Sequence, residues 1–184
     1  MYLISACLVG INCKYNGGNN FSEKALDLVK RGEAIPICPE QLGGLMTPRI
    51  PAEIKLVNGE RRVINKNGED ITMQFEKGAN EVLQLCKKLN IDKVILKQRS
   101  PSCGVGEIYD GNFNGTLING NGITSQLLID NGIEVIDLDK MHHTKANWLR
   151  IFNDKENVIV WKKGRNQHYE WNNSKSNWIC KRFF

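Results

Sequence analysis

The sequence predicts an α/β fold in which helices cover a mostly parallel sheet, followed by a small C-terminal appendage. Short apolar runs alternate with helical patterns over residues 1–138, as they do in chains that form parallel sheets. Three of these runs carry or precede a cysteine that Gly or Pro soon follows. The carboxyl ends of parallel strands share the edge where ligands bind, so the fold class also predicts where these cysteines lie.

The N-terminal segment is expected to form a strand and a helix. The apolar run 3–9 predicts the first strand, and a loop rich in Gly and Asn follows it. Ser22 is the predicted N-cap of a helix over 23–31, because serine hydroxyls accept hydrogen bonds from the first helical N–H groups. Gly32 is expected to end this helix, since glycine readily adopts the left-handed conformation found there.

The second strand is expected at 34–38. Pro36 lies within it and favours an edge position, because proline cannot donate to a neighbouring strand. The stretch 39–53 is too rich in Gly and Pro for a regular helix or strand, and it is unusually apolar for a surface loop. Long structured loops of this kind often carry function.

A hairpin and a long helix are expected next. Residues 54–66 alternate around Asn58–Gly59, the strongest short signal for a two-residue hairpin turn. Asp70 or Thr72 is expected to begin a helix, because apolar residues then recur at every third or fourth position until Asn90.

The remaining elements complete the predicted sheet. A strand is expected at 93–97, a short hairpin at 108–118, a helix from Thr124 to the Asn131–Gly132 stop, and a last strand at 133–138. This order corresponds to a Rossmann-like three-layer sandwich with about four parallel strands.

Residues 139–184 differ in composition and are expected to form a basic, Trp-rich C-terminal extension, so that the main domain spans 1–138. Residues 138–184 hold 10 Lys and Arg against 4 Asp and Glu, together with all four Trp and all three His. A helix is expected at 145–152, and a hairpin at 158–171 that turns at 164–166. Cationic and aromatic side chains bind single-stranded nucleic acid, but the same tryptophans could instead pack the extension onto the main domain.

Composition limits the chemistry of the main domain. The chain has 184 residues, 41% of them hydrophobic, and no apolar run near the roughly 20 residues that a membrane helix needs. Without a basic leader ahead of its first motif, it is expected to be cytoplasmic, with no membrane partner. Residues 1–137 contain no histidine, so catalysis by a Cys–His or Ser–His pair is not expected within this domain.

The three cysteines at the predicted strand ends are Cys7, Cys38 and Cys103. They are separated by 31 and then 65 residues, which matches no C-x-x-C zinc motif. Three thiols at one edge could hold a metal or a cluster with one position left open. A redox or nucleophilic pair, and thiols without special chemistry, stay open as alternatives.

Two other cysteines are expected to have different roles. Cys13 could be a fourth ligand, a resolving thiol or an exposed side chain, and we expect it not to be a ligand because it lies outside the strand ends. Cys86 lies among the apolar residues of the predicted long helix and is expected to be a buried core side chain.

Several polar residues beside these cysteines are candidates for catalysis or binding. Glu40 is the best carboxylate for acid–base work, and Ser100 and Ser102 flank Pro101 just before the third cysteine. The candidates for substrate binding are cations and an aromatic ring: Arg49, Lys97 and Tyr15.

Five motifs in order resemble the thiouracil desulfurases, a small bacterial and archaeal family. They are SACLVGINCKYNGG, PICPEQLGGLMTPR, NGEDITMQFEKGA, ILKQRSPSCG and GNGITSQLL, and they cover roughly residues 1–137. The resemblance implies a 4Fe–4S cluster held by Cys7, Cys38 and Cys103, with the fourth iron open. It further implies that this iron binds the sulfur of a thiolated pyrimidine, that an oxo-pyrimidine and hydrosulfide are released, and that Glu40 and a serine of the SPSC turn move protons.

Two other functions stay open. The C-terminal extension could present thiolated RNA to the site, which would make the protein an RNA-associated module. Cys7 and Cys13 could instead form a thiol-based or zinc-based redox site. The short extension differs from the larger second domain of some family members, and this difference affects the expected substrate more than the expected cluster.

Overall fold

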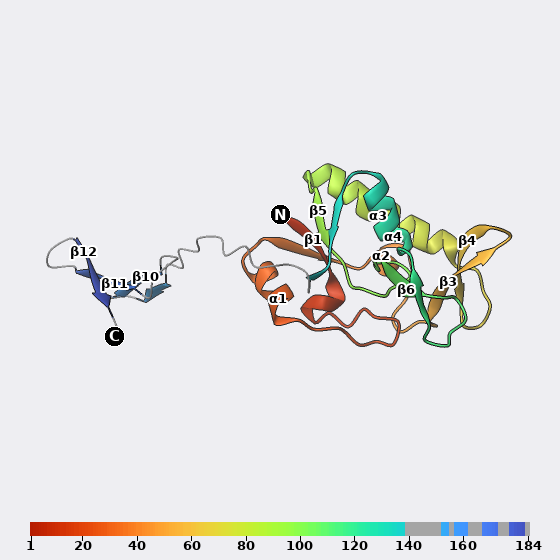
Figure 1. Ribbon diagram of the computed structural model, residues 1–184, viewed down its shortest axis with the longest axis horizontal. Helices are drawn as coiled ribbons and strands as arrows, with labels where there is room; N and C mark the ends of the chain where they lie inside the picture. The colour runs from red at the N-terminus through yellow and green to blue at the C-terminus, as the bar shows by residue number, and fades with distance from the viewer. Residues whose placement is uncertain (139–151, 155–156, 162–166, 173–176, 183–184) are drawn as a thin grey trace. The chain divides into compact units, whose positions relative to one another are not determined.

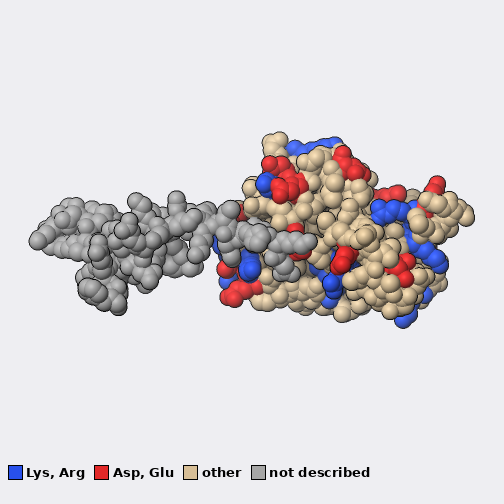
Figure 2. All heavy atoms as spheres, viewed as in Figure 1, with Lys and Arg blue, Asp and Glu red and all other residues tan. Residues whose placement is uncertain are grey.

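The structure is a computed structural model of the chain, and it describes residues 1–138, 152–154, 157–161, 167–172 and 177–182. The chain divides into two compact units, Met1–Met141 and His142–Phe184. The candidate site belongs to the first unit, which is drawn in red through teal in Figure 1. Small groups of acidic and basic side chains are scattered over the face of this unit seen in Figure 2.

Four parallel strands form the central sheet of the first unit. Their order is β2 (Ala34–Ile37), β1 (Tyr2–Ser5), β5 (Lys93–Ile95) and β8 (Glu134–Ile136). The predicted parallel sheet is confirmed, and so is the edge position of the strand that contains Pro36. Since β2, β1 and β5 are neighbours and run parallel, their carboxyl ends lie side by side.

Helices cover both faces of this sheet, which confirms the predicted three-layer sandwich. Successive strand residues point to opposite faces, so Leu3 packs in one core and Ile4 in the other. The helices α3 (Thr72–Leu89) and α4 (Ile123–Asp130) cover the first of these faces, and α1 (Glu23–Lys30) covers the second (Figure 1).

The first strand is shorter than predicted. It ends at Ser5, and the chain turns at once into the 3-10 helix η1 (Ala6–Val9). The apolar run continues through this turn because Ala6 and Leu8 are buried in the second core. An apolar run therefore marked burial correctly, but it did not distinguish an extended strand from a buried turn.

The structure confirms the predicted hairpin turn and the predicted end of the long helix, but not the predicted start of the last helix. Asn58 and Gly59 have φ angles of 53° and 83°, as a hairpin turn with two left-handed residues requires, between β3 (Ala52–Val57) and β4 (Glu60–Asn65). Asn90, at φ 52°, ends α3 as expected. By contrast, α4 begins after Gly122 rather than at Thr124, because the Thr124 hydroxyl is bonded elsewhere.

The other predicted hairpin is present as β6 (Glu107–Tyr109) and β7 (Leu117–Asn119), paired antiparallel. The expected loop at 39–53 contains one short regular element, the helix α2 (Pro39–Leu42). This helix follows Cys38 directly, and it packs against α3.

Two glycines allow this packing to be unusually close. A Cβ atom at Gly43 would lie 2.0 Å from the backbone oxygen of Gln74, and one at Gly78 would lie 2.0 Å from the backbone oxygen of Pro39. Since both obstacles are backbone atoms, they cannot move aside as a flexible side chain would. The contact fixes the backbone that carries Cys38 and Glu40.

Replacing Gly78 with Ala is expected to lower the free energy of unfolding by about 1–3 kcal/mol or more, because α2 must move away from α3. Urea unfolding of the full chain measures this change. The exposed neighbour Lys77 provides the control, and Lys77→Ala is expected to change stability by no more than about 0.5 kcal/mol. Equal stability of the two variants would show that the contact is not close in solution.

The second unit contains one antiparallel sheet in the order β12 (Asn177–Arg182), β11 (Gln167–Asn172), β10 (Asn157–Trp161) and β9 (Phe152–Asp154). The pairing of β10 with β11 confirms the two strands of the predicted hairpin, whose turn at 164–166 lies outside the described residues.

The helix expected at 145–152 also falls largely outside the described residues, and Phe152 itself lies in a strand. The side chains of the predicted nucleic-acid-binding surface are not described, so that function stays a prediction. Within the described part of the chain, no helix is both long and apolar enough to span a membrane.

Candidate functional site

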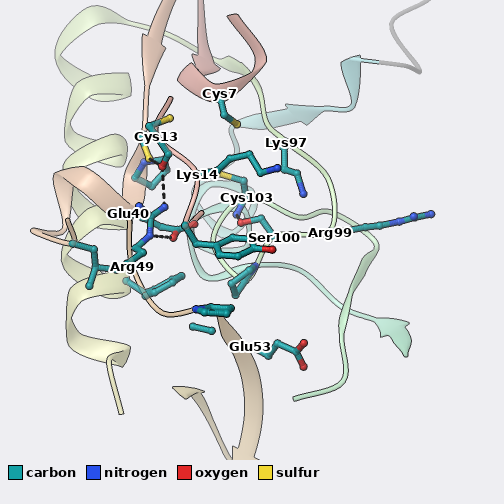
Figure 3. Close-up of a pocket in the computed structure, with 18 of the residues that line it drawn as sticks. Cys7, Cys13, Lys14, Glu40, Arg49, Glu53, Lys97, Arg99, Ser100 and Cys103 are labelled. Atoms are coloured by element: carbon teal, nitrogen blue, oxygen red, sulfur yellow. Dashed lines mark hydrogen bonds and ion pairs between the residues drawn. The ribbon is translucent and has the colours of Figure 1, made fainter. Parts of the chain in front are cut away.

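A cavity of about 460 Å³ opens at the carboxyl ends of β1, β2 and β5. Side chains from widely separated parts of the first unit line it, as Figure 3 shows. Cys7, Cys38 and Cys103 are all among them. The predicted gathering of the three cysteines at one edge of the sheet is therefore what the structure shows.

Each of these cysteines is positioned by the end of a different strand. Cys7 lies in η1 immediately after β1, Cys38 lies between β2 and α2, and Cys103 lies in the turn that follows β5. Cys7 and Cys103 are buried, and Cys38 is half-buried. The thiols are thus held in a largely dry site that still opens into the cavity.

Ser5 supports Cys103 from the last position of β1. Its hydroxyl donates to Cys103 Sγ at 3.6 Å and accepts the backbone N–H of Lys97 at 3.0 Å. Burial raises the pKa of Cys103 to about 12, against the opposing effect of the Ser5 hydrogen bond. The sequence reasoning missed Ser5, although its place two residues before Cys7 at the strand end was a usable signal.

Cys13, which lies in the loop after η1 rather than at a strand end, also lines the cavity. It is only 2% exposed, and the thiols of Cys38 and Cys7 lie near enough to affect its ionisation. Cys38 lowers the pKa of Cys13, but Cys7 and burial together raise this pKa to about 11. Cys13 and burial in turn raise the pKa of Cys38 well above its ordinary value.

Cys86 behaves as predicted. It is 1% exposed and packs in the first core with Val82 and Leu83, away from the cavity. It is a buried apolar side chain of the core.

Arg49 is bonded to the protein through all three guanidinium nitrogens. Its Nε donates to Glu40 Oε2 at 2.7 Å, and its Nη2 donates to the backbone oxygen of Cys13 at 3.0 Å (Figure 3). Its Nη1 donates to Met46 O at 3.1 Å and to Thr47 Oγ1 at 3.0 Å. Arg49 therefore joins the loop at 39–53 to the loop that carries Cys13, and it also lines the cavity.

Glu40 lines the cavity with its carboxylate held in this ion pair. Its side chain is 16% exposed and that of Arg49 is 9% exposed, so the pair is largely shielded from solvent. The carboxylate is near enough to the thiol of Cys103 and the ammonium of Lys97 to interact electrostatically with both. The predicted acid–base candidate is thus beside the thiols.

Lys97 enters the cavity from the strand end of β5. Burial lowers the pKa of its ammonium group, and the nearby Cys7 and Cys103 oppose this shift. Figure 3 shows its side chain beside Cys103. A buried cation at this place favours anionic sulfur, because it offsets the cost of burying negative charge.

The two candidate serines of the SPSC turn point to different places. Ser100 lines the cavity, and its hydroxyl accepts the backbone N–H groups of Ser102 at 3.1 Å and Cys103 at 3.2 Å. Ser102 is fully buried outside the cavity lining, and its hydroxyl is bonded to Thr124 at 2.9 Å. Ser100 therefore lines the cavity, whereas Ser102 lies behind the lining, near enough to the Cys103 thiol to lower its pKa.

Aromatic side chains and one further acid complete the lining. Tyr15 lines the cavity as predicted and is 45% exposed. The sequence reasoning missed Tyr109, Phe113 and Glu53. Glu53 Oε2 accepts the backbone N–H groups of Gly111 and Phe113, both at 3.0 Å, which holds the loop between β6 and β7 against the cavity.

The donor set suits a cluster better than a single ion. No three His, Cys, Asp or Glu side chains of the described residues are grouped closely enough to hold one metal ion. The irons of a 4Fe–4S cluster are each bound by a separate thiolate, so the ligands stand apart around it. Cys7, Cys38 and Cys103 supply three such thiols around one cavity, with the Lys97 cation near two of them.

Residues 2–140 match the 2-thiouracil desulfurase family. The chain belongs to this family. The prediction made from the five motifs is therefore confirmed. The matched range covers nearly the whole first unit and leaves the C-terminal extension outside it.

One curated protein and one solved structure are similar to this member of the 2-thiouracil desulfurase family. The uncharacterized protein YbbK of Bacillus subtilis (strain 168) is 44% identical over 148 residues, which are 77% of this chain and 98% of YbbK. The solved structure of the 4Fe–4S-dependent thiouracil desulfidase TudS is similar to this chain, with 41% identity and a TM-score of 0.70. That similarity covers 76% of this chain and 91% of the TudS chain.

Proposed function

We propose that this protein is a 4Fe–4S-dependent desulfurase that converts 2-thiouracil, or a related thiolated pyrimidine, into the oxo-pyrimidine and hydrosulfide. The observation that carries the proposal is the presence of three thiols from three strand ends in one cavity of a 2-thiouracil desulfurase family member. The 4Fe–4S dependence of TudS, which has the same fold, supports the choice of cofactor.

Cys7, Cys38 and Cys103 are the proposed cluster ligands. Thiolates are the ligands that iron–sulfur clusters prefer, and the raised pKa of Cys103 means that ligation must release its proton. When bound, the cluster supplies an iron atom without a protein ligand, which acts as a Lewis acid toward the thiocarbonyl sulfur. The neighbouring Lys97 offsets part of the negative charge that the thiolates bring.

The reaction exchanges sulfur for the oxygen of one water molecule. Glu40 is the proposed general base: its carboxylate takes a proton from the water as the water oxygen bonds to C2 of the pyrimidine. The C2–sulfur bond then breaks, the oxygen becomes the carbonyl oxygen, and sulfur leaves as hydrosulfide with one of the two protons. The second proton passes to solvent, and Ser100, which lines the same cavity as Glu40, is the proposed hydroxyl relay.

The substrate ring is proposed to lie among the aromatic side chains of the cavity. Tyr15 and Phe113 offer flat apolar surface to a planar pyrimidine, and Lys97 offers a donor for its carbonyl oxygen. Arg49 orients Glu40 rather than touching the substrate, because its nitrogens already bond to the protein.

Glu53→Ala is expected to raise KM for thiouracil about tenfold with a smaller effect on kcat. The substitution leaves two backbone N–H groups unpaired, at a cost of about 1–3 kcal/mol, and releases the loop that carries Phe113. Steady-state kinetics measure the change. Glu60→Ala is the control, because Glu60 is exposed on β4, and a KM equal to that of the control would contradict the role given to Glu53.

Anaerobic reconstitution tests the proposed function directly. The reconstituted chain is expected to contain about four iron and four sulfide per molecule, to consume 2-thiouracil, and to release one hydrosulfide for each uracil formed. Fewer than about two irons per chain, or a loaded protein that leaves 2-thiouracil intact, would contradict the proposal.

Thiolated RNA is included in the same assay because its bases carry the same thiocarbonyl group. The positive charge of the C-terminal extension supports thiolated RNA as a substrate, since 10 of the 25 Lys and Arg residues lie within 138–184. Turnover of thiolated tRNA that falls with rising salt supports RNA as a substrate, and turnover of the free base alone excludes it.

A further inference from the structure

Cys13 is a buried thiol that the proposed mechanism does not use. It lies in the same cavity as the three proposed ligands, and its thiol is near enough to those of Cys7 and Cys38 to affect their ionisation. Figure 3 shows its side chain entering the cavity close to Cys7 and above Glu40. The site thus holds four thiols, where the proposed ligand set accounts for three.

The protein fixes the Cys13 backbone from several directions. The Cys13 N–H donates to Ile11 O at 2.8 Å, and the Cys13 oxygen accepts Arg49 Nη2 at 3.0 Å. Cys38 Sγ also lies 3.9 Å from this oxygen. Lys14 then forms a closed turn, donating to Gly18 O at 3.1 Å and accepting from Gly17 N–H at 3.0 Å. These hydrogen bonds fix the backbone at Cys13, so the loop holds the thiol at a defined position in the cavity.

We propose that Cys13 is a displaceable fourth ligand, which binds the otherwise open iron of the cluster while no substrate is present. This inference rests on the proposed function. A thiolate is a far better ligand for iron than water, and 4Fe–4S clusters commonly have four thiolate ligands. Rotation about the single χ1 bond of Cys13 is enough to release the iron, so substrate sulfur can replace it without movement of the loop.

The surrounding charges suit an additional anionic sulfur. Lys14 and Lys97 line the same cavity, and the Arg49 guanidinium is near enough to Cys13 to interact with it electrostatically. Positive groups of this kind stabilise a thiolate. The consequence for function is that substrate competes with Cys13, which protects the open iron between turnovers and weakens the apparent substrate affinity.

A different role would be donation of a hydrogen bond from the Cys13 thiol to the sulfur atoms of Cys7 and Cys38. Two variants separate the roles. Cys13→Ser keeps a hydrogen-bond donor but gives a hard oxygen in place of the soft sulfur, whereas Cys13→Ala removes both. If Cys13 is a ligand, both variants behave alike; if it is a donor, the serine variant behaves like the unmodified protein.

The test uses the full chain loaded anaerobically with ⁵⁷Fe, without substrate. Mössbauer spectra of the unmodified protein are expected to show four irons in similar sulfur environments. In Cys13→Ala and Cys13→Ser, one iron is expected to become distinct, and Cys86→Ala, which removes a buried thiol outside the cavity, is expected to match the unmodified protein.

A second readout is the loss of one iron during mild oxidation, followed by the EPR signal of the three-iron product. Both Cys13 variants are expected to lose this iron about tenfold faster than the unmodified protein. If the unmodified protein already shows one distinct iron and loses it as fast as the variants, the ligand role is wrong while the proposed function stands. If the unmodified protein takes up no cluster at all, the proposed function itself fails.

Discussion

Cys103→Ala is expected to abolish cluster binding and to lower thiouracil turnover by more than about 100-fold, because a cluster with one fewer protein thiolate is bound too weakly to persist. Cys103 is the ligand that the turn after β5 contributes, and among the described residues no other cysteine of this turn can replace it. Iron content, visible absorbance and turnover after anaerobic reconstitution measure the effect.

The control for this variant is Cys86→Ala. Both residues are buried thiols of the same unit, so both substitutions remove similar apolar volume, but Cys86 lies outside the cavity. The control is expected to load the cluster normally, and each variant is expected to lose only about 1 kcal/mol of stability. A Cys103 variant that kept a full complement of iron would remove this residue from the ligand set.

Glu40→Gln is expected to leave the cluster in place and to lower kcat by about 10²–10⁴-fold, the usual contribution of a general base. Glutamine has nearly the same shape, and its amide oxygen can still accept the hydrogen bond from Arg49 Nε. The change therefore removes the basic carboxylate and preserves the local packing. Turnover is measured beside the absorbance spectrum, which reports that the cluster is unchanged.

Glu33→Gln is a matched control for the loss of a carboxylate. Glu33 also forms an ion pair with an arginine, Arg31, at 2.9 Å, but it does not line the cavity. Its substitution is expected to leave kcat unchanged. Equal activity of the two glutamine variants would mean that water is activated by another group, and Ser100 and Lys97 would be the next residues to replace.

Cys103 and Glu40 reach the site for different structural reasons. Ligation by Cys103 depends on the chemistry of thiolate and on the meeting of strand ends. The role of Glu40 depends on an ion pair that aims one carboxylate at the cavity. This pair is set by Arg49, nine positions further along the same loop. A loss of Arg49 is accordingly expected to reduce activity through Glu40.

Much of the fold followed from the sequence. Alternating apolar runs and helical patterns located the four parallel strands and the three main helices, because burial on a sheet or a helix imposes a repeating pattern. Pro36 identified the edge strand, and the Asn58–Gly59 pair identified the hairpin turn. The five motifs identified the family.

The meeting of Cys7, Cys38 and Cys103 also followed from the sequence, through the fold class. Cys7 and Cys38 lie within predicted strands, Cys103 lies in the turn that follows a third, and the carboxyl ends of neighbouring parallel strands share one edge. No long-range contact had to be known in advance. This part of the site was therefore determined by element order alone.

Only the tertiary structure decided which polar groups join these thiols. Loop residues have no repeating pattern that fixes the direction of their side chains. The sequence therefore could not show that Ser100 lines the cavity while Ser102 bonds to Thr124, or that Arg49 pairs with Glu40. Glu53 reaches the site through contacts with a hairpin about 60 positions away. Cys13 reaches it because its loop folds back against Cys7 and Cys38. Local pattern thus determined the sheet edge and its thiols, and long-range packing of loops determined the groups that surround them.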